Sequence, residues 1–354
     1  MPALDMTRSS VELTADLVDV FSVSGSEGPL ADLVEAAVTG LAHLEVTRDG
    51  DVVVARTNLG RARRAVIAGH LDTVPVNDNL PSRLDEHGIL WGRGTTDMKG
   101  GCAILLKLAV ELTDPTVDVT WIWYDNEEVA SELNGLGRVS RTHPEWLAAD
   151  FAILAEPTDA EIEGGCNGTL RAEVRTSGKR AHSARAWAGD NAIHKAAPIL
   201  QLLSDYRARE VEVDGLVYRE GLSAVGISGG VAGNVVPDEA VVTVNYRFAP
   251  DQSGDQAVAR IRDLFAGYDV TITDLADGAR PGLDDPLAQA FVAAIGSEAR
   301  PKYGWTDVAR FSALGIPAVN YGPGDPALAH ADDERVPVEQ IERCEAGLRA
   351  WLSA

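Results

Sequence analysis

Two neighbouring stretches decide how this chain is interpreted: VIAGHLDTVPV at residues 66–76 and WGRGTTDMKGG at residues 91–101. The first opens with a short apolar run that ends abruptly at His70 and Asp72. Side chains two residues apart point to the same side of an extended chain, so both can project from a strand's end. One of them can bind a metal while the other orients the imidazole ring. Asp97 adds a carboxylate in a glycine-rich loop, and the pattern predicts a metal site with further ligands elsewhere.

Apolar runs that end in polar residues recur along the chain. VDVTWIWYDNEE (117–128) and ADFAILAEPT (149–158) are strand-like and end in acids, and a mostly apolar helix is expected at 100–112. Alternating helices and such strands predict an α/β sheet, in which function gathers beyond the carboxyl ends of the strands. Further elements are expected around them: a hairpin at 44–57 and helices at 9–20 (capped at Ser9 or Ser10), 29–42, 285–296 and 336–354.

The sequence pattern changes after Gly164-Gly165. The order of the elements that follow is β-α-β-β-α-β, the ferredoxin-like pattern, and their alternation predicts an antiparallel sheet with one wet face. These elements are strands at 170–178, 222–230, 240–250 and 268–275, with helices at 190–208 (capped by Asp190) and 253–267. We therefore predict a catalytic α/β domain with a mixed sheet at residues 1–166 and 279–354, interrupted by an α+β domain at 167–278.

Composition narrows the classes of function. A length of 354 residues predicts two domains, and a net charge of -23 argues against nucleic-acid and anionic-membrane partners. The three cysteines form no CxxC pair, which indicates a reducing compartment. The N-terminal residues lack the apolar core of a signal peptide, and no apolar run approaches the roughly 20 residues that span a membrane. A cytoplasmic protein that acts on a small molecule is expected.

Five candidate metal ligands stand at predicted strand ends or in loops: His70, Asp97, Glu128, Glu156 and His330. Imidazole and carboxylate ligands without thiolates suit zinc, cobalt or manganese in a catalytic site, and disfavour a closed structural zinc site. Five ligands are too many for one open catalytic zinc. They fit two metals about 3.5–4 Å apart that share a bridging carboxylate and together activate a water and polarise a carbonyl.

Glu127, beside Glu128, is the candidate general base, because neighbouring residues at a strand's end point in different directions. Each residue taken alone has an ordinary explanation. A histidine after a strand is often structural, an adjacent pair of glutamates is often solvated, Glu156 can simply close a strand, and His330 can belong to an exposed acidic loop. These explanations weaken jointly, because they require the same pattern of strand-end ligands to arise repeatedly by accident.

The order of the motifs is recognisable: HLDTVPV, GRGTTDMKGG, DNEEV, AEPT, then AHSAR and a near-terminal histidine. It resembles the di-zinc amidohydrolase family that includes aminoacylases, bacterial glutamate carboxypeptidases, acetylornithine deacetylase and succinyl-diaminopimelate desuccinylase. The resemblance implies two Zn²⁺ per subunit, for which Co²⁺ can substitute. It also implies these roles: His70 and Glu156 on one metal, Glu128 and His330 on the other, Asp97 bridging, Glu127 as general acid/base, and Asp72 bonded to His70.

The resemblance further implies that the inserted domain is a lid through which two copies form a homodimer. His182 of AHSAR would reach a catalytic site across the dimer and stabilise the oxyanion, the alternative being a histidine on the lid surface. Asn234 is a candidate hydrogen-bond donor to substrate. Arg247 is a candidate clamp for a carboxylate, with a buried structural ion pair as the alternative.

Within the family, segments such as GGVAGNVVPD, KYGWTDVARFSALGIPAVNYGPGDP and LAHADDERVPV resemble the actinobacterial succinyl-diaminopimelate desuccinylases. This implies hydrolysis of N-succinyl-LL-2,6-diaminopimelate to succinate and LL-2,6-diaminopimelate in lysine and diaminopimelate biosynthesis, with Thr306 near the substrate. Pro326, and the turn at residues 166–169, depart from the better-known members. The alternatives are an acetylornithine deacetylase, a small-peptide carboxypeptidase or aminoacylase of the same family, and a non-catalytic metal-binding protein.

Overall fold

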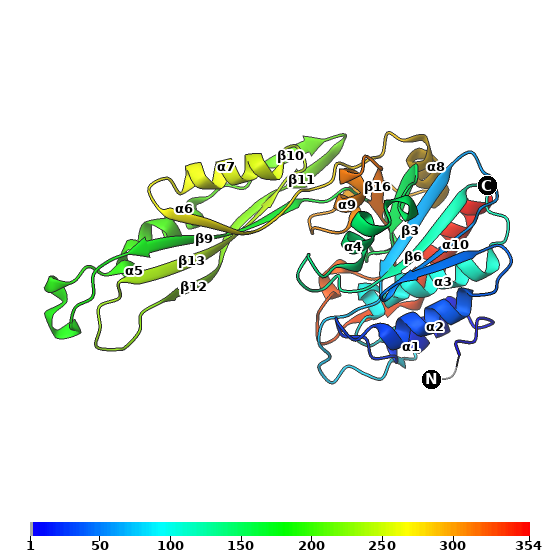
Figure 1. The fold of residues 1–354 in the computed structure, drawn as a ribbon, viewed down its shortest axis with the longest axis horizontal. Helices are drawn as coiled ribbons and strands as arrows, with labels where there is room; N and C mark the ends of the chain where they lie inside the picture. Colours follow the sequence, from blue (N-terminus) through cyan, green and yellow to red (C-terminus); the bar gives the residue numbers. More distant parts are fainter. Residues whose placement is uncertain (1–2) are drawn as a thin grey trace. The chain divides into compact units, whose positions relative to one another are not determined.

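The computed structural model describes residues 3–354, which form two compact units (Figure 1). The first unit contains the chain up to Gly164 together with Pro281–Arg300 and Arg310–Ala354. The second contains Gly165–Arg280 and Pro301–Ala309. Separate clusters of buried apolar side chains support the two units. Two cores are expected because single hydrophobic cores stop growing beyond roughly 250–300 residues.

A mixed sheet of eight strands, counted over residues 3–354, forms the centre of the first unit in the order β1-β2-β6-β3-β7-β16-β8-β15. Strands β6, β3, β7 and β16 are mutually parallel, and β1, β2 and β8 pair antiparallel. Burial on both faces explains why β3, β6 and β7 are almost continuously apolar. The predicted α/β class and the predicted hairpin are confirmed. The strands are β1 Glu45–Asp49, β2 Val52–Arg56, β3 Arg64–His70, β6 Asp118–Tyr124, β7 Phe151–Leu154, β8 Glu163–Gly164, β15 Arg300–Pro301 and β16 Ala318–Asn320.

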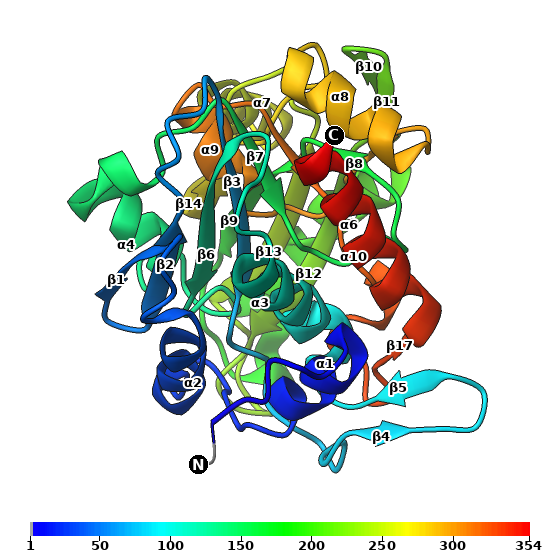
Figure 2. The ribbon, with the colours of Figure 1, turned by 90° about the vertical axis from the view of Figure 1, so that its right-hand side faces the viewer.

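Helices α1, α2, α3 and α10 pack against one another beside this sheet (Figure 2). α1 begins with the expected capping box: the Ser9 hydroxyl accepts the Glu12 N–H at 3.2 Å, and the Glu12 carboxylate accepts the Ser9 N–H at 3.0 Å. α3 is buried over nearly its whole length, as its apolar sequence predicts. The helices are α1 Ser10–Val18, α2 Gly28–Val38, α3 Gly100–Glu111, α4 Gly135–Thr142, α8 Pro286–Ile295, α9 Val308–Ala313 and α10 Val338–Ser353.

A small sheet of β4 (Arg83–Leu84), β5 (Ile89–Trp91) and β17 (Arg335–Pro337) joins the segment before Asp97 to the segment after His330. Trp91 stacks between two guanidinium groups, with Arg83 at 5.3 Å and Arg335 at 4.8 Å from its ring centre. This sheet holds two loops of the candidate site against each other. Among residues 3–354, no helix is long and apolar enough to cross a membrane.

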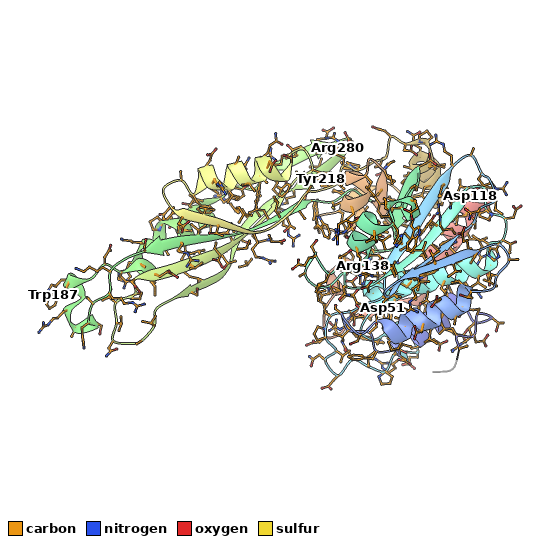
Figure 3. The ribbon with its side chains drawn as sticks, viewed as in Figure 1. Asp51, Asp118, Arg138, Trp187, Tyr218 and Arg280 are labelled. Carbon is orange, nitrogen blue, oxygen red and sulfur yellow. The ribbon has the colours of Figure 1, made fainter. Side chains whose placement is uncertain are left out.

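The second unit contains an antiparallel sheet in the order β12-β13-β9-β14, with helices α5 to α7. Along β13, buried and partly exposed residues alternate, which confirms the predicted sheet with one wet face. In Figure 3, Trp187 marks the 3₁₀ helix Ser183–Ala188 that follows β9, and this tryptophan is 83% exposed. The elements are β9 Gly168–Ser177, α5 Ala192–Lys195, α6 Ala197–Asp205, β10 Glu210–Val213, β11 Leu216–Arg219, β12 Gly221–Gly229, β13 Glu239–Phe248, α7 Gly254–Leu264 and β14 Asp269–Ala276.

For this unit, the expected continuous helix and its expected cap were wrong, and one hairpin was missed. The helix predicted at 190–208 is two helices, and the break falls just before Pro198, which cannot donate an interior helical hydrogen bond. Its cap is Asn191, whose side chain accepts backbone N–H groups, whereas the carboxylate of Asp190 pairs with Lys195. The hairpin β10–β11 was missed, although Asp214-Gly215 between two alternating runs is a strong hairpin signal.

Candidate active site

Three neighbouring parallel strands carry candidate ligands at one edge of the first unit's sheet. β3 ends at His70, β6 leads into Glu127 and Glu128, and β7 leads into Glu156. Because β6, β3 and β7 are adjacent and parallel, their carboxyl ends meet. The topology therefore brings together side chains that are far apart in the sequence.

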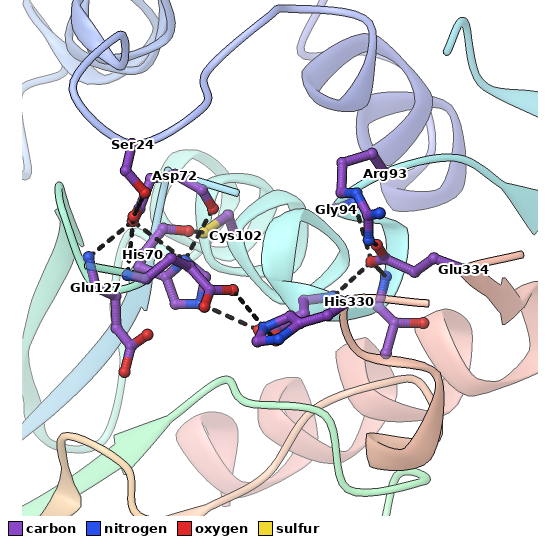
Figure 4. A network of polar contacts seen from close by, with 12 residues as sticks. Ser24, His70, Asp72, Arg93, Gly94, Cys102, Glu127, His330 and Glu334 are labelled. Carbon is purple, nitrogen blue, oxygen red and sulfur yellow. Dashed lines mark hydrogen bonds and ion pairs between the residues drawn. The ribbon is translucent and has the colours of Figure 1, made fainter. Parts of the chain in front are cut away.

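Asp97 lies on the loop between β5 and α3, and a buried carboxylate fixes that loop. Glu334 Oε1 accepts the backbone N–H groups of Gly94 at 2.9 Å, Thr96 at 3.0 Å and Asp97 at 3.0 Å. Its other oxygen accepts a hydrogen bond from the Arg93 guanidinium at 2.8 Å. This cluster appears beside His330 in Figure 4. One side chain thus determines the path of the backbone that presents Asp97.

The carboxylate of Asp97 faces two histidines, one with each oxygen. Oδ1 lies 3.1 Å from His70 Nε2, and Oδ2 lies 3.3 Å from His330 Nε2. The same nitrogen of His330 lies 2.9 Å from Glu128 Oε1. This is the arrangement that a carboxylate shared between two metals requires, with a histidine on each side.

The ligand atoms of six side chains gather in overlapping groups, within each of which they lie no more than 4.8 Å apart. Every candidate ligand predicted from the sequence belongs to at least one group. Glu127 also belongs to a group, together with His70 and Glu128, so both adjacent glutamates reach the site. The groups are His70, Asp97 and Glu156; His70, Glu127 and Glu128; and Asp97, Glu128 and His330.

His70 and the turn after β6 are both anchored on Asp72. The other ring nitrogen of His70, Nδ1, lies 3.0 Å from the backbone oxygen of Asp72 and 3.4 Å from its carboxylate. That carboxylate accepts the backbone N–H groups of Glu127 and Glu128, each at 3.0 Å, and the hydroxyl of Ser24 at 2.7 Å. Figure 4 shows the Glu127 carboxylate pointing away from Asp72. Asp72 therefore fixes both a candidate ligand and the candidate base.

The charges of the site favour bound cations. Burial opposes a positive charge on His70, but hydrogen bonds to Asp72 and Asp97 raise its pKa well above the usual value. Hydrogen bonds to Asp97 and Glu128 raise the pKa of His330 to about 10. Burial disfavours the ionised Asp97, yet hydrogen bonds from both histidines lower its pKa. The carboxylates thus favour a proton on the ring nitrogens of both histidines. A metal ion bound to these nitrogens would replace that proton.

Two glycines set the position of Glu156. A Cβ atom on Gly101, in α3, would collide with the backbone oxygen of Ala155. A Cβ atom on Gly322, after β16, would collide with the same oxygen and with the backbone oxygen of Glu156. The backbone that carries Glu156 passes between two positions without side chains, and any larger residue there would displace it.

The remaining predicted residues, His182, Asn234, Arg247 and Thr306, all lie in the second unit. His182 and Asn234 are neighbours: His182 pairs with Val235 in an isolated β-bridge, and the backbone oxygen of Asn234 accepts the Ser183 N–H at 2.9 Å. The His182 Nδ1 accepts the Ala184 N–H at 3.1 Å.

Arg247 and Thr306 lie at the other end of the second unit's sheet. Arg247 pairs with Thr169 near the start of β9, and the backbone oxygen of Thr306 lies 3.7 Å from Cys166 Sγ. Burial lowers the pKa of Arg247. Its Nε donates to Asn245 Oδ1 at 3.2 Å, and within residues 3–354 it has no ion pair. The substrate-binding role of Arg247 therefore stays a prediction.

Sequence reasoning missed four residues that shape the site: Ser24, Arg93 and Glu334, whose contacts are given above, and Glu27, whose carboxylate accepts the backbone N–H of Asn126 at 3.0 Å. The segment around Ser24 and Glu27, SVSGSEG, has the composition of an ordinary loop. Glu334 follows His330 in an acidic stretch, where a solvated position is the usual expectation. A usable signal for Glu334 was its place directly before the short strand Arg335–Pro337, at the end of the acidic loop.

Comparison with known proteins identifies the family. The sequence model of Peptidase family M20/M25/M40 matches residues 66–354, and the chain belongs to this family. A Mycobacterium tuberculosis protein provisionally named succinyl-diaminopimelate desuccinylase DapE is 56% identical over 99% of both chains. The succinyl-diaminopimelate desuccinylase of Corynebacterium glutamicum is 48% identical over 99% of this chain and 98% of its own. A Staphylococcus aureus tripeptidase has the same fold, with a TM-score of 0.80, 20% identity and coverage of 99% and 98%. The predicted family is confirmed.

Proposed function

We propose that this protein is a metal-dependent amidohydrolase that cleaves N-succinyl-LL-2,6-diaminopimelate to succinate and LL-2,6-diaminopimelate, in lysine and diaminopimelate biosynthesis. The names of two relatives that match nearly the whole chain support the substrate. The hydrolase chemistry is supported by the family and by the histidines and carboxylates gathered at the strand ends. An acetylornithine deacetylase or peptidase activity is the competing assignment.

We infer two metal sites, which suit Zn²⁺ and also Co²⁺. The observation that carries this inference is the Asp97 carboxylate, which turns one oxygen to His70 and the other to His330. His70 with Glu156 and His330 with Glu128 would complete the two sets of ligands. Bound there, such metals supply Lewis-acid polarisation of a carbonyl and a lowered pKa for a bound water.

Glu127 is our candidate for the proton transfers. Its carboxylate accepts a proton from the attacking water as the new C–O bond forms at the succinyl carbonyl carbon. It returns this proton to the leaving amine as the C–N bond breaks. Its backbone is held by Asp72, which also contacts His70, so base and ligand are kept in register by one side chain.

The active assembly that we propose is a homodimer. Arg247 lies opposite Thr169 at the start of β9, and His182 lies beyond its other end, near Ser177. A strand of this length, 10 residues, spans about 30 Å at 3.3 Å per residue. One small substrate cannot contact both ends, so His182 and Asn234 would serve the site of a second copy. There, His182 would stabilise the oxyanion while Arg247 and Thr306 bind substrate in their own protomer.

The first test measures succinate release from N-succinyl-LL-2,6-diaminopimelate by the zinc-loaded protein, with N-acetylornithine and a dipeptide in parallel. Fast cleavage of the succinylated compound, lost with chelator and restored by Zn²⁺ or Co²⁺, is the expected result. Preferential cleavage of another substrate would overturn the substrate assignment.

We also propose a cytoplasmic location. The three cysteines are free thiols in the structure, which is compatible with a reducing compartment.

The second test concerns Glu127. Glu127→Gln should lower kcat by about 10²- to 10⁴-fold, because the amide cannot accept the proton of the water. Glu132→Gln, in the exposed part of the same loop, is the matched control and should keep normal turnover. Near-normal turnover by Glu127→Gln with full metal content would contradict the assigned role.

A further inference from the structure

The turn that carries the candidate base, Glu127, has unusual backbone hydrogen bonding. The N–H groups of Asn126, Glu127 and Glu128 are consecutive, and in each case the acceptor is the oxygen of a side chain. Asp72 accepts the last two. Glu27 Oε1 accepts the first at 3.0 Å, from a position 99 residues earlier in the chain. Two buried carboxylates therefore replace the backbone partners that such a turn would otherwise need.

Glu27 is well placed to fix the conformation of this turn. Asn126 has a φ of 58°, in the left-handed region, where asparagine is tolerated but still needs support from its surroundings. Glu27 is 1% exposed, and within residues 3–354 its second oxygen has no hydrogen-bond partner. A buried acceptor aimed at the N–H of a left-handed residue holds that residue in place without touching the reacting atoms.

The segment that carries Glu27 is itself tied to the strand that presents His70. The Ser24 N–H donates to the backbone oxygen of Thr73 at 3.2 Å, and the Thr73 N–H donates to that of Ser22 at 3.1 Å. The Ser24 hydroxyl bonds Asp72, as Figure 4 shows. Residues 22–27 therefore contact both the segment that follows β3 and the turn that follows β6.

The other side of the turn is fixed separately. Arg138 of α4 (Figure 3) donates to both carboxylate oxygens of Asp125, at 2.8 and 3.2 Å, and Asp125 also accepts from the Asn126 side chain. Arg138 thereby fixes Asp125 before the turn begins. Asp72 fixes Glu127 and Glu128 at the end of the turn. Asn126 is the link between these anchors, and among residues 3–354 the acceptor for its backbone N–H is Glu27.

We propose that Glu27 is a positioning residue for the catalytic base: by accepting the Asn126 N–H it fixes the orientation of Glu127 relative to His70. The inference rests on the proposed function, since it takes Glu127 as the group that moves the proton. This role requires an oxygen atom of residue 27 that accepts the Asn126 N–H, and it does not require a negative charge.

The substitutions follow from that distinction. Glu27→Met fills the same space without an acceptor, and kcat should fall about 10- to 100-fold, because small displacements of a catalytic group have effects of that size. KM and metal content should stay within about twofold, since the ligands keep Asp72 as their anchor. Glu27→Gln keeps an acceptor oxygen and should retain kcat within about threefold, one hydrogen bond being preserved. Glu35→Ala, at a half-exposed glutamate of α2 that pairs with Arg48 and not with the turn, is the control and should keep the kcat of the wild type.

Hydrogen exchange gives a readout that does not depend on activity or substrate. In the wild type, the amides of residues 126–128 should exchange slowly, although this turn is partly exposed. In Glu27→Met the Asn126 amide should lose protection, and in Glu27→Gln it should keep it. Unprotected exchange in the wild type would overturn the proposal even if Glu27→Met failed to fold.

Different results would contradict the proposed function and the positioning role of Glu27. If the wild type cleaves none of the substrates, the proposed function fails, and the exchange measurement still decides whether Glu27 holds the turn. If the wild type is active and Glu27→Met keeps full kcat, the positioning role is wrong. If Glu27→Gln is as impaired as Glu27→Met, the charge is essential and the acceptor explanation is wrong.

Discussion

The two histidines of the candidate metal site share one carboxylate but lie in opposite surroundings. His70 ends a buried strand and is 1% exposed, with oxygen atoms of Asp72 and Asp97 beside its two ring nitrogens. His330 lies in a loop, in a left-handed conformation with φ 66°, and its side chain is 53% exposed. The His70 side is part of the protein core, whereas the His330 side lies on a loop that reaches the core through Glu334.

This difference in burial implies that the two sides of the site depend on a bound cation to different degrees. The His70 side needs a cation, or a proton, to offset carboxylates that burial makes costly. The His330 side is partly solvated, and water can screen its charges when no metal is present. We therefore expect the metal that we propose for His70 and Glu156 to bind first and to leave last.

The largest effect should appear in the stability of the metal-free protein. His70→Ala removes the positive partner of the buried Asp72 and leaves Asp97 with the half-exposed His330, so it should cost about 3–5 kcal/mol of unfolding free energy. His330→Ala removes a half-exposed contact and should cost at most about 1 kcal/mol. Urea unfolding in the presence of a chelator measures both. His87→Ala, at a histidine with 79% side-chain exposure, serves as the control. Equal losses for His70→Ala and His330→Ala would abolish the contrast.

A smaller effect is expected on metal affinity. Asp72→Asn weakens the support of His70 and should reduce the affinity for the tighter metal about 10- to 100-fold, as is typical when the partner of a ligating histidine is lost. Competition with a metal-binding dye measures this affinity. Asp332→Asn, two residues after His330, should leave it unchanged. A comparable loss in Asp332→Asn would show that general negative charge, rather than a specific contact, supports the site.

The smallest effect should follow from Ser24→Ala. It removes the 2.7 Å hydrogen bond from the Ser24 hydroxyl to Asp72 and should cost about 1 kcal/mol, which corresponds to roughly fivefold in affinity for the tighter metal. The same dye competition detects it. Ser26→Ala, in an exposed position on the same segment, is the control. If Ser24→Ala matched the loss in Asp72→Asn, the serine rather than the carboxylate would be the main support of His70.

Local sequence patterns predicted the elements whose signals are local. Strands β3, β6 and β7 are apolar runs that end in polar residues, and this pattern predicted His70, Glu128 and Glu156 at strand ends, whereas Asp97 and His330 were predicted in loops. The helix predicted at 190–208 is interrupted at Ala196, shortly before Pro198, because proline lacks the N–H that an interior helical hydrogen bond needs. The hairpin β10–β11 was missed despite its Asp-Gly turn.

The supporting residues could not be predicted from local patterns, because their partners are remote in the sequence. Glu334 bonds the Asp97 backbone across 237 positions, and Glu27 bonds Asn126 across 99. A glutamate in a loop looks the same in sequence whether it is solvated or buried against three N–H groups. Tertiary structure, rather than composition, determined these roles.

Gly101 and Gly322 limit how this site can be copied into another protein. They flank the backbone of Ala155 and Glu156 so closely that neither position has space for a methyl group. A designer who transplanted only the candidate ligands onto a foreign sheet would bring all the proposed metal-binding atoms and still misplace Glu156. A transplanted site must therefore include these two glycines as well as the candidate ligands, because the missing side chains leave space for the backbone that carries Glu156.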